Sequence, residues 1–131
     1  MKTHAIRLRP GQDIKIALEN FVKEKNIKAG FIVTCVGSLE RAVLRMADEN
    51  ITEAYNRKFE ITSLVGTLSP DGIHLHIALA DETGKIIGGH LKEGSCVYST
   101  AEIIIGESET HTFSRLHDKE TGFKELEIKE K

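Results

Sequence analysis

The amino-acid sequence predicts an α+β fold, in which a mostly antiparallel β-sheet carries one main amphipathic helix. The length of 131 residues fits a single domain, 1–131, with one modest core. Helical spacing of apolar residues is clear in only one segment, 13–26. The residues after it form consecutive β-rich runs separated by short turns, a pattern that favours an antiparallel sheet.

The first two expected elements are a strand and the helix. Alternation over residues 3–8 predicts a strand that ends at the Pro10-Gly11 break. In segment 13–26 the charged Glu and Lys residues lie on one side and the apolar residues on the other. The apolar residues are Ile14, Ala17, Leu18, Phe21 and Val22. This pattern predicts an amphipathic helix whose apolar stripe packs in the core.

The remaining β-rich runs predict the strands of the sheet. They cover residues 29–39, 41–47, 58–69, 73–81, 85–91 and 96–106. The first two runs are separated near Gly37 and Ser38, and the polar stretch 48–57 is expected to be a long loop. The segment 109–116 is expected to add an edge strand. The charged residues from about 118 to 131 are expected to form a frayed tail.

Composition and charge limit the partners of the protein. Lys and Arg total 18 against 20 for Asp and Glu, which gives a net charge of −2 and no basic cluster to attract DNA. We find no apolar signal region at the N-terminus and no run long enough to span a membrane. Cys35 and Cys96 lie in apolar runs without metal-site spacing. We expect buried thiols in a cytoplasmic protein that has no membrane partner.

The stretch 71–91 holds three of the six histidines. They are His74, His76 and His90. The turn 82–84 ends in Gly, and a three-residue loop of this kind is a common hairpin connection because Gly readily adopts the left-handed conformation. Such a loop pairs Asp81 with Lys85. This register places His76 directly opposite His90, with His74 on the same face of the hairpin.

The alternation along the hairpin supports this register. One face carries apolar residues and is expected to join the core: Ile73, Leu75, Ile77, Leu79, Ile87 and Leu91. The histidine face also carries Ala78, Ala80, Ile86, Gly88 and Lys92. Small residues beside the histidines leave room for a ligand or another subunit. A turn one residue shorter would instead place His90 on the face opposite His76.

Three neutral imidazoles at one point suit a divalent metal. Zn²⁺ takes nitrogen ligands at about 2.0–2.1 Å and prefers four tetrahedral positions. The fourth ligand could be water, a carboxylate or a group from a neighbouring subunit, and a bound water would ionise near neutral pH. The alternative is three histidines on a solvated sheet face. The ligand types leave the choice among Zn²⁺, Ni²⁺ and Mn²⁺ open.

Other residues are weaker candidates for chemistry. Lys92 shares the face of His90 and could hold an anionic group of a small-molecule ligand. Glu102, in the run "TAEIII", could be a catalytic base or a fourth metal ligand, or a structural hydrogen-bond acceptor. The Gly88-Gly89 pair does not open a helix, so it is not a phosphate loop. Ser38 lacks any base placed by the sequence. The other histidines are expected at the surface: His4, His111 and His117.

The segments "FEI", "GT", "HLHIALAD", "GGHL" and "TAEI", in this order, resemble the plant and prokaryote conserved (PPC) domain family. The resemblance extends upstream through "AGFIVTCVGSLERAVLR" and covers nearly the whole chain. It implies a homotrimer and a metal at His74, His76 and His90. Plant members carry an added AT-hook that binds the minor groove of DNA, and this element is absent here.

The sequence therefore supports three functions of different classes. The first is a small trimeric metal-binding protein. The second is a metal-dependent enzyme, with zinc as the first candidate, acting on a small polar molecule. The third is a DNA-associated regulator, which the family relationship suggests but the acidic balance and the mixed charges on the helix do not favour.

Overall fold

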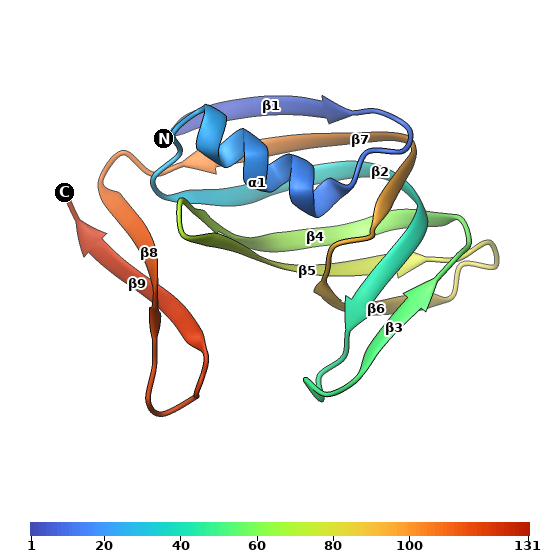
Figure 1. Ribbon diagram of the computed structural model, residues 1–131. Coiled ribbons are helices and arrows are strands. Elements are labelled where there is room, and N and C mark those ends of the chain that lie inside the picture. Colours follow the sequence, from blue (N-terminus) through green and yellow to red (C-terminus); the bar gives the residue numbers. More distant parts are fainter.

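The computed structural model describes residues 1–131 and contains one helix and nine strands (Figure 1). In chain order the elements are β1 (Lys2–Leu8), α1 (Ile14–Glu24), β2 (Gly30–Arg45), β3 (Thr52–Tyr55), β4 (Phe59–Ser69), β5 (Gly72–Ala80), β6 (Ile86–Leu91), β7 (Cys96–Glu107), β8 (His111–His117) and β9 (Lys124–Glu130). The predicted α+β class with one helix is confirmed.

The main sheet has the strand order β1-β7-β2-β4-β5-β6, and β3 pairs with β2 at the side of this path. All of these pairs are antiparallel, as the short turns predict. The end of β2 also pairs with β6, where Leu44 lies opposite Leu91 and Arg45 lies opposite His90. The sheet therefore curls so that β2 touches both β4 and β6.

Helix α1 lies across one face of the sheet (Figure 1). Asp13 caps its N-terminus, because its side chain accepts a hydrogen bond from the Ile16 N–H at 3.1 Å. The buried face of the helix consists of Ile14, Leu18, Phe21 and Val22. Burial of each such side chain contributes about 1.5–3 kcal/mol relative to exposure. The predicted packing of this stripe against the core is confirmed.

Strand β2 differs from its prediction. The expected break near Gly37 and Ser38 is absent, and one strand runs from Gly30 to Arg45. Three register shifts against β7 interrupt its pairing, including one between Gly37 and Leu39. A β-bulge bends a strand without ending it. The break predicted near Gly37 and Ser38 is therefore a bend in β2, which allows the end of this strand to pair with β6.

Two other expectations about loops are wrong. The stretch 48–57 contains β3, which pairs with β2. Residues 124–130, expected to lie in a frayed tail, form β9 and pair with β8 in a separate two-stranded sheet. The segment 109–116 is therefore not an edge strand of the main sheet. Figure 1 shows this C-terminal hairpin, β8–β9, standing away from the main sheet.

The C-terminal hairpin is tied to the main sheet by hydrogen bonds from β8. The Phe113 N–H donates to the Lys28 carbonyl at 2.9 Å. The Arg115 N–H donates to Oδ2 of Asp71 at 3.1 Å, and the Arg115 guanidinium donates to the Thr67 hydroxyl at 2.8 Å. These contacts fix β8 beside the turn between β4 and β5.

The single helix, α1, lacks the length and apolar character that a membrane crossing requires.

Candidate metal centre

The hairpin of β5 and β6 has the register that the sequence predicts. The Asp81 N–H donates to the Lys85 carbonyl at 2.9 Å, and Gly84 adopts φ +87°. The Asp81 side chain reinforces the loop by accepting from the Thr83 N–H at 2.9 Å and from the Lys85 N–H at 3.0 Å. The loop therefore has the length that the Gly position predicts, and the pairing beyond it follows.

The three hairpin histidines converge on one point. His76 pairs directly with His90, and the ring centroids are 5.0 Å apart for His74–His76, 5.0 Å for His74–His90 and 5.7 Å for His76–His90. One ligand nitrogen from each ring lies within 4.8 Å of the other two. We call these three residues the histidine triad.

The spacing of the triad fits a divalent metal. Nitrogen ligands at about 2.0–2.1 Å in a tetrahedral arrangement lie about 3.3 Å from one another. The ligand nitrogens of the triad lie within 4.8 Å of one another, so the rings would have to approach further to reach this spacing. None of the three rings is fully buried, since His76 is exposed and the other two are half-buried. The residues present therefore suit a metal with nitrogen ligands.

The strands behind the triad hold it in place. Leu75 and Ile77 alternate with the histidines and are buried in the core. Gly66 of β4 lies against His74, and a Cβ atom at Gly66 would collide with the carbonyl oxygen of His74. Only glycine allows β4 and β5 to approach so closely here. The position of His74 thus depends on a glycine of the neighbouring strand.

Arg45 contacts the triad from β2. Its Nη2 atom lies 3.3 Å from Nδ1 of His90. A guanidinium can only donate, so Nδ1 accepts and the ring proton of His90 resides on Nε2. A metal bound at Nδ1 would displace Arg45, and a metal bound at Nε2 would require a proton on Nδ1, facing the guanidinium. In either case Arg45 has to release His90 when a metal binds.

Two of the three imidazoles resist protonation. Burial and the positive charge of Arg45 are the main causes that lower the pKa of His90 from 6.5 to about 4. Burial and the positive charge of Arg115 lower the pKa of His74 in the same way. Both rings are therefore neutral near pH 7. Neutral imidazole is the form that coordinates a metal.

A cleft of about 730 Å³ opens over the triad. The predicted candidate Lys92 lines it, together with Arg45. Its far wall comes from the C-terminal hairpin, which contributes Arg115, Phe123, Lys124 and Glu125. The sequence prediction missed this wall, because nothing local in residues 111–130 connects them to histidines far earlier in the chain.

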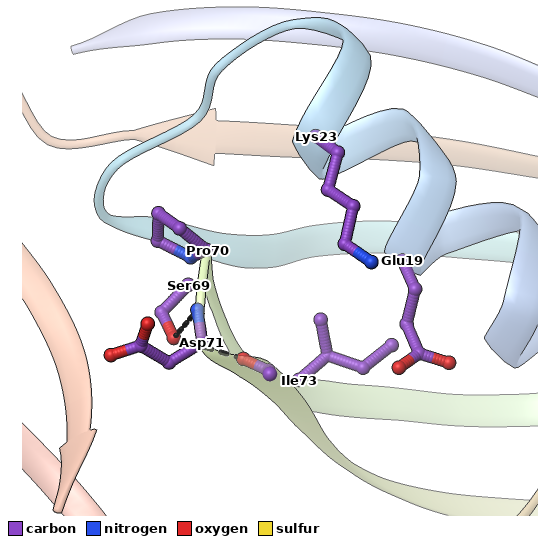
Figure 2. Close-up of a pocket in the computed structure, with 7 residues that line it drawn as sticks. Glu19, Lys23, Ser69, Pro70, Asp71 and Ile73 are labelled. Atoms are coloured by element: carbon purple, nitrogen blue, oxygen red, sulfur yellow. Dashed lines mark hydrogen bonds between the residues drawn. The ribbon is translucent and has the colours of Figure 1, made fainter.

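A second and much smaller pocket, about 80 Å³, lies between α1 and the β4–β5 turn. Figure 2 shows Glu19 and Lys23 of α1 beside this turn, with Ser69 and Asp71 joined by a hydrogen bond of 3.3 Å. The Asp71 carboxylate accepts from β8 on the side of the larger cleft. The small pocket contains none of the triad and holds no cluster of metal-ligand groups.

Glu102 is not part of this site. It lies on β7, paired with Val36 of β2 and Arg7 of β1, and it does not line the cleft. Its carboxylate accepts from the Thr100 hydroxyl at 3.2 Å. Within one chain, Glu102 therefore acts as a hydrogen-bond acceptor and does not supply a fourth ligand to the triad.

The remaining candidate residues have other surroundings. The Ser38 hydroxyl bonds to the Ser99 hydroxyl at 3.0 Å. Cys35 and Cys96 are free and half-buried, less buried than expected. Burial, together with the nearby negative charge of Glu102, raises the pKa of Cys35 to about 11. This thiol is therefore protonated and weakly nucleophilic at neutral pH.

Of the three histidines expected at the surface, only His117 is exposed. His111 is half-buried, and its Nδ1 lies 2.9 Å from the Thr110 hydroxyl. His4 was placed wrongly, because its Nε2 lies 3.0 Å from a carboxylate oxygen of the buried Glu107. Its ring also packs edge-on against Phe21. The pairing of β1 with β7 brings His4 and Glu107 together, although they are far apart in the sequence.

Comparison with known protein families identifies a match over most of the chain. The sequence pattern of the Plants and Prokaryotes Conserved (PCC) domain matches residues 1–109. This is the family that the hairpin motifs predict. Two curated relatives, both named bifunctional protein GlmU and both from Synechococcus strains, are 44% identical over 128 residues. The chain spans about a fifth of the length of these relatives.

Solved structures share the fold. A hypothetical protein from Salmonella enterica is 40% identical, with a TM-score of 0.95 over 98% of this chain and 94% of that chain. A metal-containing protein from Archaeoglobus fulgidus is 28% identical, with a TM-score of 0.79 over 95% and 91%. A plant- and prokaryote-conserved protein from Pyrococcus horikoshii is 23% identical, with a TM-score of 0.80 over 97% and 92%.

Proposed function

Because this chain belongs to the Plants and Prokaryotes Conserved domain family, we propose that it is a small homotrimeric metal-binding protein. In this proposal His74, His76 and His90 hold one divalent ion, with zinc as the first candidate. The observation that carries the proposal is the approach of one nitrogen from each ring to within 4.8 Å of the others. A similar fold described as metal-containing, from Archaeoglobus fulgidus, supports it.

The chemistry of the triad also supports a metal. Two of its rings are held neutral by burial and nearby positive charge, which lower the pKa of His90 and of His74. Protons therefore compete weakly with a metal at these two rings near pH 7. Three imidazoles and one further ligand would complete a tetrahedral zinc site.

The test is a calorimetric titration of the apo-protein, purified without a histidine tag, with Zn²⁺. We expect one ion per chain for the wild type and a sharp loss of affinity for His74→Ala, His76→Ala and His90→Ala. His117→Ala is the matched control, because His117 is exposed and lies outside the cleft. Equal affinity in all four variants would mean that the triad does not bind the metal.

The homotrimer rests on the family resemblance and on one surface of the chain. The sheet face turned away from α1 exposes apolar side chains, including Val36 at 61% and Val65 at 54%. Val65 pairs directly with His76, so this apolar surface adjoins the triad. We propose that subunits associate through this face and that the metal centre lies at or near the interface.

The cleft of about 730 Å³ favours one alternative, a metal-dependent enzyme that acts on a small polar molecule. A bound zinc ion would supply Lewis-acid chemistry, and Lys92 and Arg115 would hold the polar molecule. Metal removal distinguishes the two functions. A structural ion should loosen the trimer when it is removed, whereas a catalytic ion should leave the trimer intact and abolish turnover only.

A DNA-associated role is the weaker candidate. With a net charge of −2, we expect low and non-specific affinity for DNA, with a shallow dependence on salt. Gel-shift measurements at physiological salt test this expectation. Nanomolar, sequence-dependent binding would favour the regulatory function over metal binding alone.

A further inference from the structure

The lining of the cleft over the histidine triad has one more cationic than acidic side chain. Four cationic and three acidic side chains line it. The cationic residues are Arg45, Lys92, Arg115 and Lys124. None of the four forms an ion pair, since the five ion pairs of the structure all involve other residues. Unpaired cations that converge on one cleft create a site for a negative charge.

Arg115 is fixed in this cleft by the C-terminal hairpin. Its guanidinium donates to the Thr67 hydroxyl at 2.8 Å, and Thr67 pairs with His74 across β4 and β5. A guanidinium has five N–H donors in a planar fork, so this bond leaves others free. Arg115 is half-buried, and burial lowers its pKa. A partly desolvated guanidinium gains more from a bound anion than an exposed one does.

Arg45 becomes available when a metal binds. It donates to Nδ1 of His90, and coordination of His90 would require it to release that atom. The released guanidinium remains beside the triad, because Arg45 pairs with His90 across β2 and β6. Metal binding thus frees a second fork of donors at the edge of the cleft.

A metal alone would be poorly matched to these surroundings. The triad is a neutral ligand set, and the chain brings only these three ligand groups together. A divalent ion there would lie beside two guanidiniums, and the one nearby carboxylate, Glu125, is shared between His74 and Arg115. An oxyanion would fill the fourth position and neutralise that charge. Arginine is also the side chain best suited to hold a carboxylate or phosphate group, through paired hydrogen bonds.

We propose that this cleft binds a small molecule through an oxyanion group, a carboxylate or a phosphate, which contacts Arg45 and Arg115 and completes the coordination of the metal. The proposal rests on the metal site proposed above and names the class of ligand for it. Metal and anion binding are coupled, so each raises the affinity of the other by the same factor. Arg115 lies beyond residues 1–109, so one of the two anion contacts comes from the hairpin outside the segment that matches the family.

The test measures zinc affinity in three salts of equal ionic strength: sodium perchlorate, sodium acetate and sodium sulfate. Acetate represents a carboxylate, sulfate represents a tetrahedral phosphate-like group, and perchlorate coordinates metals poorly. We expect the Kd for zinc to fall by about 5- to 150-fold in acetate or in sulfate relative to perchlorate, the usual range of coupling between two sites. The anion with the larger effect identifies the preferred group.

Variants of Arg45 and Arg115 test whether these residues carry the coupling between zinc and the oxyanion. In Arg115→Gln and Arg45→Gln we expect the oxyanion effect to disappear, while zinc affinity in perchlorate stays the same or rises, since a repelling charge has been removed. A folding defect would lower affinity in every salt. Arg9→Gln is the matched control, because Arg9 is exposed and lies outside the cleft, and it should keep the full effect.

The outcomes separate the two proposals. Tight zinc binding with the same Kd in all three salts would overturn the anion site and leave the metal site standing. An oxyanion effect that survives both Arg115→Gln and Arg45→Gln would overturn the assignment of the contact to these residues. The absence of zinc binding in every salt would overturn the metal site, and the coupled anion site with it.

Discussion

Arg45 and His90 face each other across strands β2 and β6, with Nη2 of Arg45 donating to Nδ1 of His90 at 3.3 Å. These two residues are far apart in the sequence, and the pairing exists only because the long, bent β2 reaches β6. The contact places a fixed positive charge against one member of the histidine triad. It helps to keep that ring neutral and makes Arg45 a competitor of any metal.

The first prediction concerns the pH dependence of stability of the metal-free protein. The pKa of His90 is about 4 in the fold and about 6.5 when unfolded. Below about pH 6.5 the unfolded state therefore binds more protons, and the free energy of unfolding falls as the pH drops toward 4. Above about pH 6.5 this residue adds no pH dependence. The lowered pKa of His74 acts in the same direction.

Urea denaturation in the presence of a chelator measures this effect. Between about pH 7 and about pH 4.5, His90→Gln should lose less stability than the wild type, because the substituted side chain does not titrate. His117→Gln should follow the wild type. An identical loss in the wild type and His90→Gln would show that the His90 environment does not oppose protonation.

The second prediction concerns the close contact between β4 and β5. Gly66 and Gly72 have similar φ values, +157° and +148°, but a Cβ at Gly66 meets the His74 carbonyl whereas a Cβ at Gly72 meets nothing within 4 Å. Gly66→Ala should therefore destabilise the protein by about 1–3 kcal/mol more than Gly72→Ala, the usual cost of overpacking. Chemical denaturation of both variants measures the difference.

Gly66→Ala should also weaken the proposed zinc binding, because relief of the collision would move His74 away from His76 and His90. Calorimetry on the same two variants tests this. If Gly72→Ala destabilised the protein as much as Gly66→Ala, backbone strain rather than the contact with His74 would be the cause.

The third prediction concerns the pair of His4 and Glu107, whose side chains are 15% and 11% exposed. Burial raises the pKa of Glu107, but hydrogen bonds from His4 and from the Lys28 N–H outweigh it and leave the pKa below 4.5. The charged carboxylate therefore stabilises the fold above about pH 4.5, and this contribution is lost as the pH falls through the lowered pKa. Glu107→Gln should cost about 1–3 kcal/mol at pH 7.

Denaturation of Glu107→Gln near pH 7 and near pH 3 measures this contribution, and the difference from the wild type should shrink in acid. Glu109→Gln is the control, because Glu109 is 60% exposed in its pair with the N-terminus. A cost for Glu109→Gln as large as that for Glu107→Gln would contradict the assignment to the buried pair.

The fourth prediction concerns assembly. Val36 is exposed on the sheet face turned away from α1, beside Glu102 of β7. Val36→Arg should convert the proposed trimer to monomer while leaving the fold intact, because the new charge can pair with Glu102 within the chain. Sedimentation equilibrium at micromolar concentration measures the mass. Ile16→Arg is the control, since Ile16 is exposed on α1, which covers the opposite face.

Gly88 is a poor position for this test. A Cβ there would lie 2.8 Å from the Ile77 carbonyl oxygen of the same chain, so a larger residue would disturb the hairpin before it reached a partner. A wild-type protein that sediments as a monomer would remove the proposed trimer altogether.

Local patterns were enough to predict the hairpin that carries the triad. The position of Gly84 sets the loop length, and the alternation of apolar and histidine residues allows only one register that buries Leu75 and Ile77. The helix could be predicted for the same reason, since the stripe ending at Phe21 and Val22 has helical spacing. In both cases the interacting residues are close in the chain.

The sequence alone determined the fold class, the family and the convergence of His74, His76 and His90, because all of these depend on spacing within short segments. Tertiary structure alone decided that Arg45 and Arg115 enclose the triad, that Glu102 lies elsewhere and that His4 is held by Glu107. Those positions depend on bulges in β2 and on the docking of β8, where a shift of one residue reverses which side chains meet. Short-range periodicity carries no information about which distant strands will become neighbours.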